Sequence, residues 1–197
     1  MRCYCCSSKP FKECCEPFIT GVKHPNSAEQ LMRSRFSAYA TANYRYILET
    51  YTKAKQQDLS VEDLAQSAQG ATWFALRVHP TFTGSLEDSF VDYSVDSPKK
   101  SSTNANANIE LGTDVDSSSK PDFKANAAVV EFTAYYFESK SMHQLHETSN
   151  FNIEDGKWRY HDGVLHDDCG KIKYGRNLPC VCGSNKKFKQ CCGLKNR

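Results

Sequence analysis

Cysteine is the residue type in this chain whose spacing most clearly indicates chemistry. Nine of the ten cysteines lie in two clusters, one near each end of the 197-residue sequence. Each cluster has the pattern C-x-C-x8-C-C, in which a pair separated by one residue is followed, eight residues later, by an adjacent pair. The eight cysteines of the two patterns are Cys3, Cys5, Cys14, Cys15, Cys180, Cys182, Cys191 and Cys192. Zinc prefers four ligands in a tetrahedron, so the spacing predicts two tetrathiolate Zn2+ sites.

The two clusters form an internal repeat. Besides the four cysteines, the aligned segments share four residues, which are Ser7/Ser184, Lys9/Lys186, Phe11/Phe188 and Lys12/Lys189. The phenylalanine could cover one face of the metal, and the lysines favour thiolates by lowering the pKa of nearby thiols. The alternative is a pair of free-thiol or disulfide clusters. Adjacent cysteines rarely bridge to each other, because disulfide geometry needs separated Cα atoms, so metal is the favoured interpretation.

Two cysteines lie outside the repeated pattern. Cys6 could compete as a ligand or act as a reactive thiol, whereas Cys169 stands alone and is better interpreted as a buried structural thiol. The chain starts Met-Arg-Cys-Tyr-Cys-Cys, with neither a signal peptide nor an apolar stretch long enough to cross a membrane. We therefore expect a cytoplasmic protein without membrane insertion. Thiols stay reduced there, which again favours metal over disulfides.

Charge is unevenly distributed along the chain. The segment 170–197 holds eight basic residues and no Asp or Glu, which leaves 17 basic and 23 acidic residues elsewhere. A basic tail on an acidic body suggests an anionic partner, such as RNA or an acidic protein surface, although a merely solvated tail is the alternative. The residues we expect to make this contact are Lys186, Lys187 and Lys189.

The C-terminal cluster resembles a known motif. Residues 175–193 read GRNLPCVCGSNKKFKQCCG, which resembles the SEC-C motif, the zinc-binding C-terminus of the translocase ATPase SecA that contacts the chaperone SecB and the ribosome. Asn185 replaces the usual Gly, and Cys192 stands where the SecA version has His. The N-terminal copy keeps all four ligands but lacks the lead-in, and it has Cys6 and Pro10 in place of Gly183 and Lys187, which leaves its loop conformation open.

The whole arrangement is similar to the bacterial YchJ family. Segments 31–39 (LMRSRFSAY), 73–78 (WFALRV) and 156–163 (GKWRYHDG) carry the resemblance. It implies an α+β fold, a cystatin-like or nuclear transport factor 2-like cone with helices packed on a curved antiparallel sheet and a SEC-C module at each end. The expected domains are 1–22, 23–168 and 169–197, with a polar insertion at 85–125. The resemblance implies no defined reaction.

The residues between the clusters give the same fold class. A capping box at Ser27 and a helical apolar period predict a helix over 27–51. A second helix is capped by Ser60 with Asp63 and stops at Gly70. Aromatic and β-branched runs predict strands at 73–83, 127–139, 143–153 and 157–161, with a hairpin turn at 154–156 and part of 85–95 as a further candidate strand. Residues 97–126 are polar and indicate a long loop.

A cone of this kind often encloses a pocket. The candidate pocket residues are Arg33, Arg35, Tyr39 and His161, with Tyr160 and Asp162 beside the last of these. A semi-buried Arg35 needs a carboxylate or carbonyl partner, so it either binds an anion or ties the helix to a loop or zinc module. His161 and Asp162 could be an acid–base pair, but strand alternation and a turn at 162–163 argue against it. The remaining histidines, including His143, His146 and His166, show no metal-ligand spacing.

Three functions remain open. The residues favour an interaction protein that docks through its SEC-C modules on the ribosome, nucleic acid or a chaperone, and they favour a binding role over an enzymatic one. The alternative is a small-molecule-binding protein or an isomerase- or dehydratase-like enzyme that uses the cone, with purely structural zinc. Metal or redox sensing through Cys6 is a third hypothesis. No substrate, partner or oligomeric state follows from the residues.

Overall fold

The computed structural model describes residues 1–80 and 126–194. Its centre is an antiparallel sheet in the order β1-β2-β3-β4, and a short strand β5 pairs with β3. The strands are β1 (Thr72–Val78), β2 (Ala127–Glu138), β3 (Ser141–Glu154), β4 (Lys157–Leu165) and β5 (Gly170–Lys171). The predicted strands at 127–139 and 143–153 are confirmed, β4 runs four residues beyond its predicted end, and the predicted insertion at 85–125 lies outside the described residues.

Two tight turns join the long strands. Asp155 and Gly156 both have positive φ, at 51° and 72°, as a two-residue hairpin of the predicted kind requires. Ser139 and Lys140 also have positive φ, at 47° and 61°, although neither is Gly or Asn. The register that follows sets the face of each side chain, because neighbours along a strand alternate between faces.

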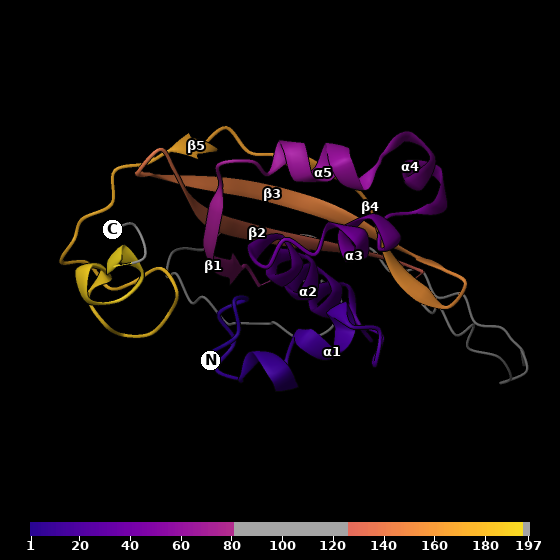
Figure 1. Cartoon of the computed structure of the whole chain (residues 1–197), viewed down its shortest axis with the longest axis horizontal. Coiled ribbons are helices and arrows are strands. Elements are labelled where there is room, and N and C mark those ends of the chain that lie inside the picture. Colours follow the sequence, from indigo (N-terminus) through magenta and orange to yellow (C-terminus); the bar gives the residue numbers. More distant parts are fainter. Residues whose placement is uncertain (81–125, 195–197) are drawn as a thin grey trace, which may run out of the picture. The chain divides into compact units, whose positions relative to one another are not determined.

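The helices precede the sheet in sequence and pack on one of its faces (Figure 1). They are α1 (Glu16–Ile19), α2 (Ala28–Ala40), α3 (Tyr44–Glu49), α4 (Lys53–Asp58) and α5 (Val61–Ser67). Short 3-10 turns lie in the two cysteine segments, at η1 (Phe11–Glu13), η2 (Phe188–Gln190) and η3 (Cys192–Leu194). Helix α2 contacts β1, β2 and β4, so it forms the layer over the sheet. No helix among the described residues is long and apolar enough to cross a membrane.

The predicted helix over 27–51 is wrong in one respect, because it is split into α2 and α3. Ala42 has φ 56°, in the left-handed region, and its N–H bonds to the Tyr39 carbonyl at 3.2 Å. The Asn43 N–H returns to the Ala38 carbonyl at 2.8 Å. This pair of bonds is a Schellman ending, which usually has glycine where this chain has Ala42.

The helix caps follow the sequence more closely. Ser60 and Asp63 form the predicted capping box at the start of α5. Ser27 accepts the Gln30 N–H at 3.2 Å, whereas the Gln30 side chain accepts from Asn26 instead of completing a box with Ser27. Helix α4 was not predicted, because its sequence KAKQQD has no apolar period.

The main core lies between α2 and the sheet. Leu31, Met32 and Phe36 from the helix pack with Phe132 and Phe151 from β2 and β3, and all five are at most 6% exposed. A second apolar cluster lies on the opposite sheet face, where Phe74, Phe137 and Met142 meet the C-terminal cysteine segment. The two cysteine segments therefore belong to different apolar clusters.

Candidate metal centres

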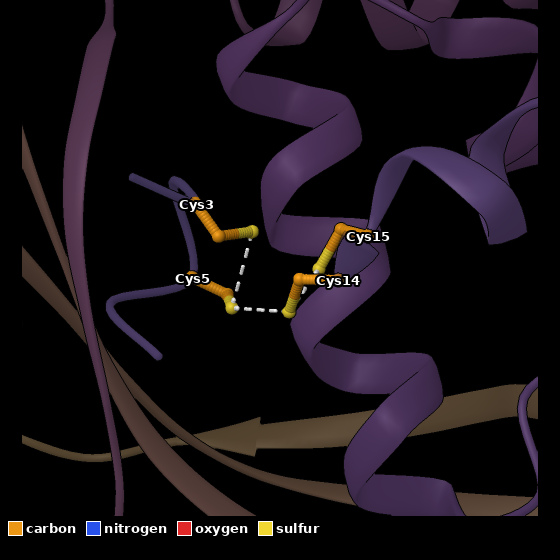
Figure 2. Close-up of side chains that lie close together, drawn as sticks. All are labelled: Cys3, Cys5, Cys14 and Cys15. Carbon is orange, nitrogen blue, oxygen red and sulfur yellow. Dashed lines mark hydrogen bonds between the residues drawn. The ribbon is translucent and has the colours of Figure 1, made fainter. Parts of the chain in front are cut away.

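The N-terminal cluster brings its four predicted cysteines together. Cys3 and Cys5 come from the first extended residues, whereas Cys14 and Cys15 lie between η1 and α1, and their sulfurs point toward one another (Figure 2). Neighbouring sulfurs are 3.4 Å apart for Cys3 and Cys5, 3.7 Å for Cys5 and Cys14, and 3.8 Å for Cys14 and Cys15. A tetrahedron with Zn–S distances near 2.3 Å has edges of about 3.8 Å, so the set fits a tetrahedral metal.

The C-terminal cluster repeats this arrangement. One sulfur from each of Cys180, Cys182, Cys191 and Cys192 lies within 4.8 Å of the other three. The Cys182 and Cys191 sulfurs are 3.5 Å apart, too far for a disulfide, and all four cysteines are free. Each cluster can therefore hold a four-coordinate metal ion.

The two loops share one backbone conformation, which resolves the question left open for the N-terminal copy. The Cys3 N–H bonds to the Lys9 carbonyl at 3.0 Å, as the Cys180 N–H does to Lys186 at 2.8 Å. Ser7 and Ser184 each contact the third cysteine sulfur, at 3.1 and 3.2 Å.

Left-handed backbone explains the residue differences between the copies. Cys6 has φ 62° where Gly183 has φ 68°, so the N-terminal loop keeps the conformation with a residue less suited to it. Asn185, which replaces the usual Gly of the motif, has φ 59°, a conformation that Asn tolerates. Pro10 and Lys187 both adopt extended backbone before a 3-10 turn.

The close approach of the sulfurs shifts the pKa of individual thiols in each cluster. Sulfur–sulfur hydrogen bonds with Cys15 and Cys3 lower the pKa of Cys5 well below its ordinary value, and the same kind of contact with Cys3 and Cys5 raises that of Cys15. Burial raises the pKa of Cys192, and the neighbouring thiolates of Cys180 and Cys182 raise it further. Four thiolates at these distances repel one another, and a divalent cation among them would favour ionisation of all four.

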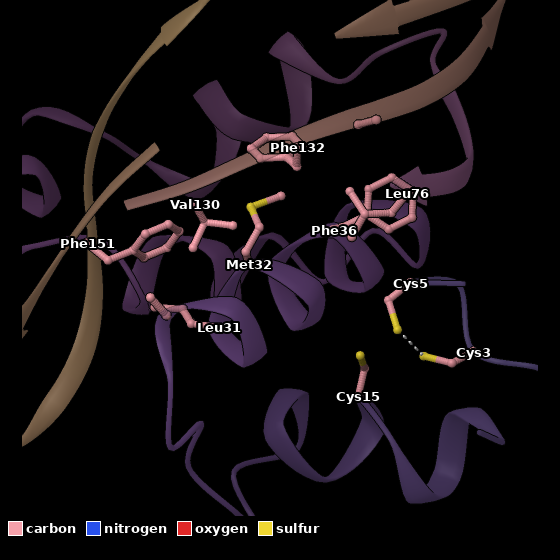
Figure 3. Close-up of a cluster of buried hydrophobic side chains, with 12 residues drawn as sticks. Cys3, Cys5, Cys15, Leu31, Met32, Phe36, Leu76, Val130, Phe132 and Phe151 are labelled. Carbon is pink, nitrogen blue, oxygen red and sulfur yellow. Dashed lines mark hydrogen bonds between the residues drawn. The ribbon is translucent and has the colours of Figure 1, made fainter. Parts of the chain in front are cut away.

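The N-terminal module is built into the main core. Cys3, Cys5 and Cys15 are each at most 3% exposed and belong to the apolar cluster under α2, at one end of which their sulfurs gather (Figure 3). Arg33 on α2 donates to the Cys5 carbonyl at 3.1 Å, and the Cys15 thiol donates to the Arg33 carbonyl at 3.5 Å. Arg33 thus ties the helix to the module instead of lining the cone pocket.

The C-terminal module packs on the other face of the sheet through Phe188. Its ring is 7% exposed and lies 6.4 Å from the rings of Phe74 and Phe137, and 5.2 Å from that of Tyr174. Phe188 therefore anchors the module to the sheet, while its expected role in covering one face of the metal stays a prediction.

The basic side chains of the C-terminal module are exposed to solvent. Lys186, Lys187 and Lys189 are all exposed, and none of them forms an ion pair with a carboxylate within residues 1–80 and 126–194. Lys171, Lys173 and Arg176 are exposed as well.

The two modules also contact each other. Arg2 donates to the Cys6 carbonyl at 3.1 Å and to the Cys182 carbonyl at 3.2 Å. The Cys6 sulfur lies outside the four-sulfur cluster and accepts the Leu76 N–H at 3.4 Å, and burial raises the pKa of this thiol to about 11. A protonated thiol is a poor nucleophile, which argues against a redox-reactive Cys6. Cys169 is half-buried and bonds to the backbone of His146 at 3.2 Å.

A cavity of about 290 Å³ lies between the helices and the sheet. Its lining is Met32, Arg35, Phe36, Tyr39, Tyr51, Ser67, Ala68, Trp73, Phe132, Ala134, Leu145, Glu147 and Tyr160. Of the four candidate pocket residues, Arg35 and Tyr39 line this cavity, whereas Arg33 and His161 are not among its described lining residues. His161 is the extra residue of a bulge in β4, and the cavity lining includes its neighbour Tyr160 but not His161.

Arg35 has partners that account for its burial at 4% exposure. Its guanidinium donates to the Ile47 carbonyl at 2.9 Å and to Thr50 at 2.7 Å, and it lies 4.3 Å from the Tyr51 ring centre and 4.6 Å from that of Tyr160. The carbonyl partner expected for this residue is present, and it ties α2 to the end of α3. Cation–π contacts in a desolvated site contribute about 2 kcal/mol.

Glu147 was not predicted from the sequence, and it presents the one carboxylate among the described residues of the cavity lining. This carboxylate accepts from Ser149 at 2.5 Å and from Tyr160 at 2.8 Å. Burial raises the pKa of Tyr160, and the nearby Glu147 raises it further, so the phenol keeps its proton and donates it. Nothing in the local sequence marks Glu147, because its partners come from β3 and β4.

Comparisons with known proteins agree with this architecture. The pattern of the YchJ middle NTF2-like domain matches residues 27–113 and 99–163, and that of the SEC-C motif matches residues 176–194. A UPF0225 protein of Photorhabdus laumondii is 33% identical over 97% of this chain and 98% of its own length. A UPF0225 protein of Geobacter sulfurreducens is 30% identical over 97% of both chains.

Two solved structures have a related fold. A SEC-C motif-containing protein from Psychrobacter arcticus gives a TM-score of 0.55 at 23% identity, over 98% of this chain and 96% of its own. Another from Rhodopseudomonas palustris gives a TM-score of 0.58 at 25% identity, over 85% of this chain and 100% of its own. The resemblance seen in the residues is therefore confirmed, and the chain belongs to the YchJ family of UPF0225 proteins, with an NTF2-like domain and a SEC-C motif.

Proposed function

We propose that this protein is a cytoplasmic zinc-binding adaptor whose C-terminal module docks on an anionic macromolecular surface. The observation that carries the proposal is the pairing of a closed tetrathiolate cluster with exposed lysines that have no carboxylate partner in the described part of the chain. Zinc is the metal we assign to both clusters, because four cysteine thiolates in a tetrahedral set favour it.

Zinc in these clusters has a structural role. A tetrathiolate shell leaves no coordination position for water or substrate, which argues against metal catalysis. The chemistry that the metal supplies is crosslinking, since it holds the C-x-C turn to the C-C pair. The eight cysteines need to stay reduced to bind it, which supports a cytoplasmic location.

The two modules differ in role. The N-terminal sulfurs lie in the main core and are fastened to α2 through Arg33, so we assign this module to folding. The C-terminal module holds its sulfurs and Phe188 inside while Lys186, Lys187 and Lys189 face solvent. A rigid basic surface of this kind suits phosphate contacts, and ribosomal RNA is the partner to test first.

The test compares matched lysines of the two repeats. Binding of the zinc-loaded protein to ribosomes and to isolated ribosomal RNA is measured over a range of salt concentrations. In one variant Lys186, Lys187 and Lys189 are all replaced by Glu. In the control variant Lys9 and Lys12, which align with Lys186 and Lys189 in the repeat, are replaced by Glu. Three phosphate contacts contribute about 2 to 3 units to the slope of log K against log[salt]. The slope measured for the Lys186, Lys187 and Lys189 variant should therefore be smaller in magnitude than that of the wild type by about 2 to 3 units.

The outcomes separate the partners. Loss of slope and affinity in the C-terminal variant, with the control unchanged, supports docking on RNA. Binding to intact ribosomes but not to RNA would point to an acidic protein surface. An affinity that does not change with salt concentration, or an equal loss of affinity in both variants, would contradict the proposal.

The cavity supports a second candidate function, the binding of a small molecule. Six of its thirteen lining residues are aromatic, and Glu147 offers an acceptor for a hydrogen-bond donor on an apolar ligand. Arg35 Nη1 is already bonded to Ile47 and Thr50, so this nitrogen ties α2 to the end of α3. A ligand-detected NMR screen of apolar amines and phenols tests this function. Compounds that bind the Glu147→Gln variant as tightly as the wild type would contradict it.

A further inference from the structure

Three histidines and two carboxylates gather on the sheet face turned away from helix α2. His79 follows β1, Glu131 lies on β2 and His146 lies on β3, whereas His166 and Asp168 follow β4. The buried residues Val130, Phe132 and Ala134 face the helix, so Glu131 and Thr133 face the opposite way. His146 pairs with Thr133 across the strands and shares that face.

Donor atoms of three of these residues converge. One ring nitrogen each from His79 and His146 and a carboxylate oxygen of Glu131 lie within 4.8 Å of one another. His146 Nε2 is 3.0 Å from Glu131 Oε1, and the two imidazole rings are 5.2 Å apart. We propose that His79, Glu131 and His146 form a third metal site, for a divalent transition metal such as Zn2+, separate from both cysteine clusters.

The surroundings of His146 fit a metal ligand. Its Nδ1 lies 2.9 Å from Asp168 Oδ1, and Gln144 donates to the other Asp168 oxygen at 3.0 Å. In the metal-bound form this carboxylate would hold the proton on Nδ1, which leaves the Nε2 lone pair for the ion. Metal-bound histidines in proteins usually have such a carboxylate partner.

The neighbours of the site hold the His146 ring in place. The His166 ring stacks on it at 3.8 Å with a 6° angle between planes, while His166 itself is bonded to Thr148 at 2.8 Å. The Cys169 sulfur, which lies just before β5, bonds to both the N–H and the carbonyl of His146. His146 is 15% exposed and Glu131 is 40% exposed, so an ion can reach the site from solvent.

The three donor atoms must move closer together to bind a metal ion. Ligand atoms at about 2.0–2.1 Å from a tetrahedral ion lie about 3.4 Å apart, so the widest separation closes by at most about 1.4 Å. The ion takes the place of the hydrogen bond between His146 and Glu131, and His79 gives up its contact with Thr133 at 2.9 Å. Two imidazoles and one carboxylate leave open positions for water, unlike the four-thiolate clusters.

A different role for the same residues is a simple ion-pair network, in which a protonated His146 joins Glu131 and Asp168. The two roles differ in metal binding, so a titration separates them. Protein that holds two zinc ions per chain by elemental analysis is titrated with ZnCl2 by calorimetry, and imidazole resonances are followed by NMR. We expect a third equivalent to bind and to shift the His79 and His146 resonances.

Variants complete the test. Asp168→Asn should weaken the third site about 10- to 100-fold, and His146→Gln and His79→Gln, which each remove a ligand, should weaken it more than Asp168→Asn does. His143→Gln is the control, since His143 lies on the same strand but on the other face, and its titration should match that of the wild type. If His146→Gln fails to fold, Glu131→Gln and His79→Gln carry the test. Absence of a third equivalent, or its survival in the folded variants, would overturn the proposal.

Discussion

The clearest single perturbation of the cavity is Gly163→Ala on β4. An added Cβ at this position would collide with the Glu147 carboxylate, and the Glu147 side chain also supplies the other nearest atoms. Gly163 does not have positive φ, so its backbone accepts alanine and the cost arises from this contact alone. Glu147 can rotate away, but it then loses its bonds to Ser149 and Tyr160.

The expected cost follows from those two bonds. A hydrogen bond to a charged group contributes about 1.5 kcal/mol at the lower end of its range, which suits a half-buried carboxylate, and two bonds give about 3 kcal/mol. Replacing Gly with Ala recovers up to about 1 kcal/mol by restricting the unfolded chain. The net loss is about 2 kcal/mol, or about 4–8 °C in Tm for a chain of this length.

A double-mutant cycle assigns the loss to Glu147. The free energies of unfolding of wild type, Gly163→Ala, Glu147→Ala and the double variant are measured by urea denaturation of zinc-loaded protein. In the double variant the collision is gone, so adding Gly163→Ala to Glu147→Ala should cost nothing. A Gly163→Ala variant within about 0.5 kcal/mol of wild type, or the same loss in both backgrounds, would refute the reasoning.

Three further predictions concern other parts of the chain. Ala42→Gly should raise the free energy of unfolding by about 1 kcal/mol, because glycine suits the left-handed position of the Schellman ending; thermal melts check it. The ion pair with Lys53 lowers the pKa of Asp155, so the pair stabilises the fold above the ordinary Asp pKa, and this stabilisation is lost as the pH falls. Asp155→Asn should therefore reduce the loss of unfolding free energy at acid pH, and an unchanged dependence of unfolding free energy on pH would contradict this. Cys3→Ser should lower Tm more than Cys180→Ser, because the N-terminal sulfurs lie in the main core, and the reverse order in calorimetry would contradict that assignment.

Local spacing explains why the metal clusters could be predicted from the sequence. Each set of four cysteines falls within 13 residues, so one loop brings them together and the repeat exposes the pattern. The strong strand at 127–139 and the capping box at Ser60 could also be predicted, because their signals lie in neighbouring residues.

Features that depend on distant residues could not be predicted in the same way. Glu147 acquires its role from Tyr160 and Gly163 on the next strand, and the His79, Glu131 and His146 set comes from three separate segments. The helix break at Ala42 was missed for a different reason. Alanine favours helices, and only the bonds at Ala38 and Tyr39 reveal that it occupies a position usually held by glycine.

The central claim is that two separate tetrathiolate clusters each hold one zinc ion. Elemental analysis of reduced protein, purified without added metal and washed with a weak chelator that strips loosely held ions, tests it most directly. The wild type should contain two zinc ions per chain, and Cys3→Ser and Cys180→Ser should each contain one. Wild-type protein that is folded and reduced but holds no zinc, or variants that both retain two ions, would contradict the account.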